Sequence, residues 1–311
     1  MPSTTAFFGD LVTNFGPLTT TYTAPASCYT GTEHVYYGNA SNLANIQGQP
    51  TCSIQPYGDC MPSGTLYDSL VAHAWATPSQ AFVNYYSPGL VCPSGWTTAG
   101  AFARDGETGF KSSGVFTQDP YPRGNARYLT PPARQLAGKD VWEGVLKESE
   151  TLAYCCPSGY TAAISGAING ACWSSLGPFE EFDYSSNCYV FLPDEALVTV
   201  ESFDGSTWTP PLLSITPATN ALTTHKQELS DEWAVVYTDW DILTMVPAVP
   251  LVFQPTDTAS ASKGEDAEES SGKDESDDDN AAAIGLSGPG LVQLGAVLVS
   301  MFVGAGLLVA W

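Results

Sequence analysis

Residues 87–99, SPGLVCPSGWTTA, and residues 151–163, TLAYCCPSGYTAA, share the core Cys-Pro-Ser-Gly-aromatic-Thr. Pro-Ser-Gly favours a tight turn, because proline presets its own φ and glycine adopts positive φ without steric cost. An apolar run precedes each turn, and an aromatic residue and a threonine, both common in strands, follow it. We therefore expect each copy to form a β-hairpin that a cysteine pins, with a binding loop presented twice as the functional alternative.

The composition around these motifs also favours strands. The chain contains 15 Tyr, 8 Trp and 13 Phe, and many of them stand beside Thr, Val or Ser. Its 29 Gly and 23 Pro suit a turn-rich β fold and disfavour long helices. We predict a mainly β fold: a single disulfide-stapled, β-sandwich-like domain over residues 1–257, with short helices at 66–82 and 140–148.

Alternating apolar and polar residues predict further strands in the second half of this domain. Residues 186–204 and 206–216 are predicted to form hairpin strands around Asp204-Gly205. Residues 231–246, DEWAVVYTDWDILTMV, are rich in branched and aromatic side chains, which predicts a buried strand.

All cysteines of the chain lie within this predicted domain, and their number is even: Cys28, Cys52, Cys60, Cys92, Cys155, Cys156, Cys172 and Cys188. An even number without any Cys-x-x-Cys pair favours disulfides in an oxidising compartment over a zinc site. The connectivity stays open, since this number of cysteines allows about a hundred pairings. Two local links, Cys52–Cys60 and Cys156–Cys172, are the candidates that spacing suggests.

The C-terminal part of the chain changes in composition. Residues 258–288 are rich in Ser, Ala, Asp and Glu and are predicted to be an acidic, disordered stalk. Residues 289–311 are predicted to enter a membrane, because an uncharged helix of this length spans about 30 Å. No Lys or Arg follows the apolar run, which favours a glycosylphosphatidylinositol-anchor signal over a retained transmembrane helix. Asn280 is the candidate attachment residue, and Ser271-Gly272 is a second candidate site.

The N-terminal residues 1–20 lack the basic start and the apolar run of a signal peptide. Three explanations stay open: a missing first exon, an unusual route of secretion, or a tail-anchored protein whose domain faces the cytosol. The last would leave the cysteines in a reducing compartment, so we expect the extracellular side of the cell membrane. Asn39-Ala40-Ser41 is a glycosylation sequon, and we expect Asn39 to be glycosylated on an exposed loop.

The charge balance limits the partners of the protein. It has 33 acidic and 10 basic side chains, a formal net charge of −23. This charge repels phosphate backbones, so we expect no nucleic-acid partner. The expected partner is a lipid bilayer, which the C-terminal tail enters, and cell-wall polysaccharide is a further candidate.

No residue pattern predicts catalysis, and we expect neither enzyme activity nor a cofactor nor a metal site. A Ser-His-Asp hydrolase would use His34, His73 or His225 as its base, but the sequence has no Gly-x-Ser-x-Gly elbow. The acidic run Asp274–Asp279 lacks the ligand spacing of a calcium loop. Trp173 and Trp240 are candidate sugar platforms. The candidate carboxylates for glycoside hydrolysis lie near them in the sequence and are Glu180, Glu181, Asp183, Asp239 and Asp241.

The sequence resembles a group of filamentous ascomycete cell-surface proteins in four features. They are the doubled motif, the Cys155-Cys156 pair, the stretch PLTTTYTAPASC at 17–28 and Trp240-Asp241. The resemblance covers residues 16–250. It implies a single extracellular cysteine-rich domain, a low-complexity stalk and a hydrophobic C-terminus, and it implies no activity and no catalytic residues. The chain departs from the group in lacking a signal peptide.

We therefore expect a membrane-tethered cell-surface or cell-wall protein of structural or adhesive type. The alternative is a carbohydrate-binding or carbohydrate-active surface protein. A second alternative is a tail-anchored membrane protein that faces the cytosol.

Overall fold

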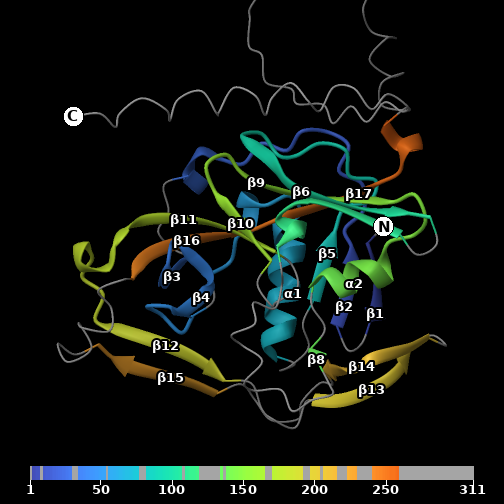
Figure 1. Cartoon of the computed structure of the whole chain (residues 1–311). Helices are drawn as coiled ribbons and strands as arrows, with labels where there is room; N and C mark the ends of the chain where they lie inside the picture. Colours follow the sequence, from blue (N-terminus) through green and yellow to red (C-terminus); the bar gives the residue numbers. More distant parts are fainter. Residues whose placement is uncertain are drawn as a thin grey trace, which may run out of the picture. The chain divides into compact units, whose positions relative to one another are not determined.

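Figure 1 shows the computed structural model of the chain. The structure describes residues 2–7, 10–29, 34–53, 55–76, 82–106, 109–118, 134–135, 138–164, 170–191, 197–203, 206–215, 223–229 and 240–258. These residues belong to one compact unit, Met1–Glu268. The predicted tail at 289–311, Asn280 and the predicted stalk beyond Thr258 lie outside the described residues and remain predictions, as do the domain boundaries.

Two larger sheets organise the unit. The first has the strand order β10-β11-β16-β3-β4, formed by Thr161–Ala163, Ala171–Pro178, Asp241–Pro247, Val35–Asn39 and Asn42–Gly48. The second has the order β17-β9-β6-β7, formed by Val249–Phe253, Thr151–Pro157, Trp96–Asp105 and Gly109–Gly114. Every pairing within these two sheets is antiparallel.

Three smaller sheets accompany them. One joins β1 (Ser3–Phe7), β2 (Asp10–Asn14) and β5 (Phe82–Tyr85). The other two appear in the lower part of Figure 1 and pair β12 with β15 and β13 with β14 and β8. β12 spans Ser186–Phe191 and β15 spans Thr223–Glu228. β13 spans Leu197–Phe203, β14 spans Ser206–Ile215 and β8 spans Arg134–Gln135.

Short helices complete the described part of the chain. The α-helices are α1 (Gly64–Ala76) and α2 (Gly138–Val145). The single 3-10 turns are η1 (Ala26–Tyr29), η2 (Gly58–Cys60), η3 (Val115–Thr117) and η5 (Phe179–Glu181). The prediction of a mainly β, disulfide-stapled fold with short helices is confirmed. Both helices begin two residues before their predicted starts, at 64 and 138.

The strands β16 and β17 connect the two larger sheets through Ala248. Val246 of β16 pairs with Cys172 of β11, while Val249 of β17 pairs with Cys155 of β9. The Ala248 backbone N–H donates to the Gly170 carbonyl oxygen at 3.2 Å between these pairings. One nearly continuous stretch of chain therefore runs through both sheets and fixes their relative position.

The two Cys-Pro-Ser-Gly copies do not form the predicted hairpins. The second turn leads from β9, in the four-stranded sheet, to β10, in the five-stranded sheet, so the two strands are not partners. Instead the copies pair with each other, because β6, which begins at Trp96, runs antiparallel to β9 with Trp96 opposite Pro157. The turn chemistry itself is confirmed: Gly95 and Gly159 have φ of 76° and 85°.

The adjacent cysteines of β9 form disulfides with different partners. Cys155 bonds to Cys92, and Cys156 bonds to Cys172 on β11. Successive side chains of a strand point to opposite faces, so neighbouring cysteines reach different partners. The predicted link Cys156–Cys172 is confirmed.

The remaining disulfides correct the second local prediction, Cys52–Cys60. Cys28 in η1 bonds to Cys60 in η2, and Cys52 bonds to Cys188 on β12. Cys52 follows β4, and the backbone of Gln49 is bridged to Cys188, so the fold brings Cys52 beside a strand 136 residues away. No cysteine is free.

The main core lies against the four-stranded sheet. Its largest fully buried side chains are Trp142 on α2, Tyr154 on β9, Phe102 on β6 and Phe116 in η3. The Trp142 indole N–H donates to the Tyr154 hydroxyl at 2.7 Å, which satisfies a buried donor that would otherwise be costly. The whole central segment of β9, residues 152–156, is buried, in agreement with its unbroken apolar sequence.

The late strands agree in part with the sequence. β13 and β14 form the predicted hairpin, with Phe203 opposite Ser206, but residues 186–191 of the same predicted strand form β12, which pairs with β15 instead. Of the buried strand predicted at 231–246, residues 231–239 are not described, and β16 occupies Asp241–Pro247. Within the described ranges, no helix is long and apolar enough to span a bilayer.

Candidate functional site

The three histidines lie on separate elements. His34 immediately precedes β3, His73 lies in the last turn of α1, and His225 lies on β15. His73 and His225 are exposed, whereas His34 is half-buried in a pocket. The described structure thus gives His34 a concave environment and places the other two on the surface.

The candidate carboxylates lie outside that pocket. Glu180, Glu181 and Asp183 are exposed in and after η5, and Asp239 lies outside the described residues. Asp241 accepts a hydrogen bond from the Ala40 backbone N–H at 3.0 Å, so it stabilises the β3–β4 turn.

The two candidate sugar platforms are both engaged in packing. Trp173 is only 5% exposed and meets Tyr36 edge to face, with ring centroids 5.3 Å apart. Its indole nitrogen has no hydrogen-bond partner among the described residues. Trp240 stacks on buried Tyr37, with centroids 6.1 Å apart. Trp173 therefore does not present a ring face at the surface, contrary to its candidate role.

The sequon lies in the turn between β3 and β4. Asn39 is half-buried, Ala40 and Ser41 are exposed, and the Asn39 side-chain oxygen accepts a hydrogen bond from the Ser41 backbone N–H at 2.8 Å. The exposed-loop prediction agrees with this position, and glycosylation of Asn39 stays a prediction. The acidic run Asp274–Asp279 lies outside the described residues.

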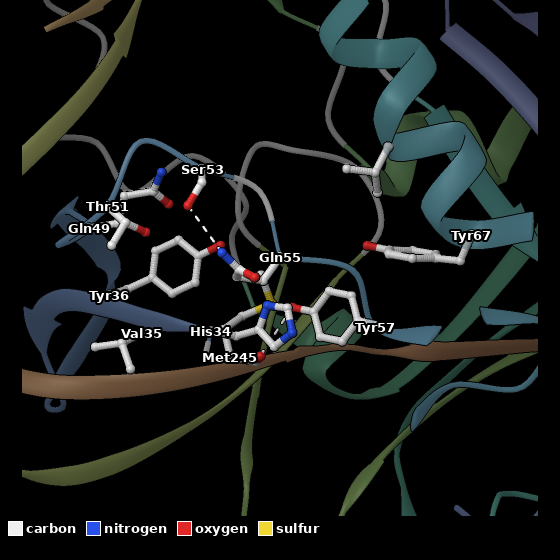
Figure 2. A pocket seen from close by; sticks show the side chains of 11 residues that line it. His34, Val35, Tyr36, Gln49, Thr51, Ser53, Gln55, Tyr57, Tyr67 and Met245 are labelled. Atoms are coloured by element: carbon white, nitrogen blue, oxygen red, sulfur yellow. Dashed lines mark hydrogen bonds between the residues drawn. The ribbon is translucent and has the colours of Figure 1, made fainter. Parts of the chain in front are cut away.

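The pocket beside His34 has a volume of about 130 Å³ and is the candidate functional site. One side is formed by the five-stranded sheet, from which His34, Tyr36 and Met245 contribute side chains. β3 and β16 pair antiparallel, and the Met245 backbone N–H donates to the His34 carbonyl oxygen at 3.0 Å. The opposite side is formed by α1. The described residues that line it are His34, Val35, Tyr36, Gln49, Thr51, Ser53, Gln55, Tyr57, Tyr67, Val71 and Met245 (Figure 2).

An alternating segment forms the third side of the pocket. Gln49, Thr51, Ser53, Gln55 and Tyr57 all line it, at every second position of the sequence QPTCSIQPY. The described backbone of this segment is irregular, and Tyr57 has helical φ and ψ of −85° and −26°, but all five of these side chains face the pocket. Cys52, at an intervening position, is bonded to Cys188 and attaches the segment to β12.

Tyr57 is held at the inner end of this segment by α1. The Asp68 carboxylate accepts hydrogen bonds from the backbone N–H groups of Tyr57 and Gly58, both at 2.8 Å. The Tyr57 hydroxyl donates to the Met245 carbonyl oxygen at 3.2 Å. The His34 ring stacks on the Tyr57 ring with centroids 3.7 Å apart and an angle of 7° between the planes. These contacts connect helix, segment and sheet through one tyrosine.

The phenols of the pocket are neutral at physiological pH. Burial raises the pKa of Tyr57 well above its ordinary value, with further contributions from Tyr67, Tyr36 and Asp68. Burial is also the main cause that raises the pKa of Tyr67, and it raises the pKa of Tyr36. A neutral phenol both donates and accepts a hydrogen bond, so these side chains contribute polarity without charge.

The described lining of the pocket is polar without a charged Asp, Glu, Lys or Arg side chain. Among the described residues that line it, the polar groups are amides, hydroxyls and one imidazole, and none is Asp, Glu, Lys or Arg. Within the part of the chain that the structure describes, no group of three or more His, Cys, Asp or Glu side chains is arranged to hold a metal ion.

Sequence reasoning singled out His34 alone among the lining residues. A pattern in the sequence could have identified five more of them. Polar side chains alternate with other residues at Gln49, Thr51, Ser53, Gln55 and Tyr57, and such alternation predicts a segment with one polar face. Nothing in the sequence indicated that Tyr36 and Met245 would lie opposite that face, because the pairing of β3 with β16 joins residues about 200 positions apart.

Comparison of the chain with protein-family models, with curated proteins and with solved structures gave no match.

Proposed function

We propose that the chain is a membrane-tethered protein of the cell surface or cell wall, of structural or adhesive type. Its disulfide-stapled domain would lie outside the membrane, and its C-terminal hydrophobic tail would enter the bilayer. The observation that carries this proposal is that all eight cysteines are paired, in four disulfides. Such pairing is stable in oxidising compartments and rare in the cytosol.

The disulfides also support a mechanical role. They connect η1 to η2, the segment after β4 to β12, the first Cys-Pro-Ser-Gly copy to β9, and β9 to β11. Each link restricts the unfolded chain and stabilises the folded domain by about 2–4 kcal/mol. A domain that is stapled between its sheets resists unfolding, as a protein exposed outside the cell requires. The same pairing argues against the tail-anchored, cytosol-facing alternative.

Surface labelling of intact cells tests the location. Cells that express the full chain are treated with a membrane-impermeant, amine-reactive label, and the purified chain is examined for modified lysines such as the exposed Lys111 and Lys226. The proposal predicts labelling of intact cells. Labelling that requires permeabilised cells would support the cytosol-facing alternative instead.

The mode of attachment is tested on the same cells. Release by a phosphatidylinositol-specific phospholipase would support the glycolipid anchor at or near Asn280. Resistance to the enzyme, with extraction only by detergent, would support a retained helix at 289–311. Recovery of the chain in the aqueous fraction without either treatment would contradict the proposed tether.

Binding of carbohydrate is a second candidate function. The specific observation that favours it is the uncharged pocket lined by tyrosines, amides and hydroxyls. Sugar-binding sites combine aromatic rings, which contact the C–H faces of a pyranose, with a few placed polar groups. Incubating the full chain with an immobilised array of neutral and acidic glycans tests this candidate, since retention of none of them would contradict it.

A further inference from the structure

We propose that the pocket between α1, the five-stranded sheet and the alternating segment Gln49–Tyr57 binds one hexopyranose ring of a neutral glycan. This inference rests on the second candidate function, carbohydrate binding, and is independent of where the protein is located. It assigns the site and the ligand class to named residues.

The size of the pocket limits the ligand to a single ring. Its volume is about 130 Å³. A cavity of about 150 Å³ in another protein accommodates benzene. Because a hexopyranose has about twice the heavy atoms of benzene, the pocket can hold at most part of one sugar, and its remaining hydroxyls and the neighbouring units of a chain would have to lie outside it. A terminal sugar or a side-branch sugar satisfies this condition.

The described lining of the pocket disfavours ionic ligands. Among the described lining residues none is Asp, Glu, Lys or Arg, so an ammonium group would meet no carboxylate there, and a phosphate or carboxylate would meet at most the imidazole of His34. Burying an ion without a partner costs far more than its contacts return. The formal net charge of −23 further disfavours anions. The ligand is therefore neutral.

The polar groups of the lining favour a ligand with several hydroxyls. Gln55 donates its side-chain N–H to the Ser53 hydroxyl at 3.1 Å, and its amide oxygen can accept from a ligand. In the view of Figure 2, the Gln55 amide lies between the Tyr36 ring and the stacked rings of His34 and Tyr57. The amide and the rings line the same pocket, so within this proposal the amide would meet the hydroxyls of the sugar and a ring would meet its C–H face.

Exposure along the alternating segment gives the pocket an entrance and an inner end. Thr51 and Ser53 are exposed, Gln55 and Tyr57 are half-buried, and Tyr67 on α1 is buried. A ring would enter past the two hydroxyls and reach the aromatic side chains. This order of polar entrance and aromatic interior favours a pyranose over a purely apolar ring, which would leave the amides unpaired.

The three histidines provide a direct test. Only His34 lines the pocket, while exposed His73 and His225 lie outside it and report on the rest of the fold. The full chain is labelled with ¹³C at histidine, and its imidazole resonances are assigned with single His→Gln variants. Neutral methyl glycosides of glucose, mannose, galactose and N-acetylglucosamine are then titrated to about 100 mM, which saturates a site of millimolar Kd. We expect at least one glycoside to shift the His34 signal and leave the other two unchanged.

Two further probes separate the ligand classes. Phenol tests an aromatic ring with a single hydroxyl, and tetramethylammonium tests a cation against the tyrosine rings. A His34 shift with phenol or tetramethylammonium, and with no glycoside, would overturn the proposal. The absence of any His34 shift with all probes would overturn it as well.

A matched pair of variants connects the shift to the lining. Gln55→Met removes the amide at nearly constant volume, while Gln118→Met makes the same change at an exposed position outside the pocket. We expect Gln55→Met to weaken glycoside binding about tenfold and Gln118→Met to leave it unchanged. Equal effects would overturn the proposal. If the glycan array retains a ligand equally with wild type and Gln55→Met, carbohydrate binding stands and this site is wrong.

Discussion

The Ser158 backbone N–H donates to the Gly95 carbonyl oxygen at 2.9 Å, which joins the turns of the two Cys-Pro-Ser-Gly copies. Each turn is closed by its own bond, from Trp96 N–H to the Pro93 oxygen and from Tyr160 N–H to the Pro157 oxygen, both at 3.0 Å. The Cys92–Cys155 disulfide crosslinks the same two copies. The repeated sequence thus forms one paired structure where β6 begins and β9 ends.

Replacing the turn glycines by alanine should destabilise this structure through the backbone alone. Gly95 and Gly159 have positive φ, are exposed, and would place an added Cβ in open space. We expect Gly95→Ala and Gly159→Ala each to lower the free energy of unfolding by about 1 kcal/mol, because alanine resists the left-handed region. Denaturant unfolding with disulfides intact measures the change.

Asparagine at the same positions provides the matched control. Asn tolerates positive φ better than Ala, so Gly95→Asn should recover part of the lost stability. If alanine and asparagine cost the same amount, or if neither costs anything, the positive φ is not what the turn requires.

The buried hydrogen bond between Trp142 and Tyr154 should contribute measurably to the core. Tyr154→Phe removes the acceptor and leaves the indole donor unpaired in a fully buried environment. We expect a loss of about 1–3 kcal/mol in the free energy of unfolding. Tyr184→Phe, at a half-buried ring, should change it far less. If Tyr154→Phe left the free energy of unfolding unchanged, the Trp142 indole N–H would have to donate to another acceptor.

Removing the Cys52–Cys188 disulfide should act on one region. The double variant Cys52→Ala/Cys188→Ala frees the alternating segment from β12, and we expect a loss of about 2–5 kcal/mol in stability. Hydrogen exchange should accelerate in β12 and β15 and in the segment, while β6 and β9, which retain Cys92–Cys155, stay protected. Uniform acceleration throughout the unit would contradict this local role.

The buried tyrosines predict a loss of stability at high pH. Burial raises the pKa of Tyr57, Tyr67 and Tyr154 in the folded protein. The unfolded chain then releases these protons near pH 10 while the folded chain retains them, so the stability they contribute is complete below pH about 10 and falls above it.

Ultraviolet absorption at alkaline pH measures this effect rapidly, before disulfide exchange begins. The exposed tyrosines should ionise near pH about 10, and the buried ones only when the protein unfolds at higher pH. Ionisation of all 15 tyrosines in a single transition near that pH, without unfolding, would contradict the buried positions.

The sequence predicted the fold class and the helices because these depend on local composition and periodicity. It also predicted Cys156–Cys172, which closes a short loop of sequence separation 16. It failed for Cys52, whose partner is 136 residues away, and for the two turns, whose strands pair with each other rather than within each copy. Strand pairing between distant segments is decided by packing, which local patterns do not encode.

The candidate site shows the same division. The alternation from Gln49 to Tyr57 is legible in the sequence as a polar face. The opposite face is not, because Tyr36 and Met245 meet only through the pairing of β3 with β16, and Asp68 positions Tyr57 from α1. The local sequence pattern therefore identifies the residues on one side of the pocket, and only the tertiary structure identifies those on the other sides.

The central claim, that all cysteines are paired in an oxidised domain, is tested most directly by peptide mapping of the non-reduced protein. The cells that produce the protein are lysed in an alkylating reagent, so that free thiols are trapped at once. The account predicts the pairs Cys28–Cys60, Cys52–Cys188, Cys92–Cys155 and Cys156–Cys172, with no alkylated thiol. Alkylation of all eight cysteines would contradict an oxidised, surface-exposed domain.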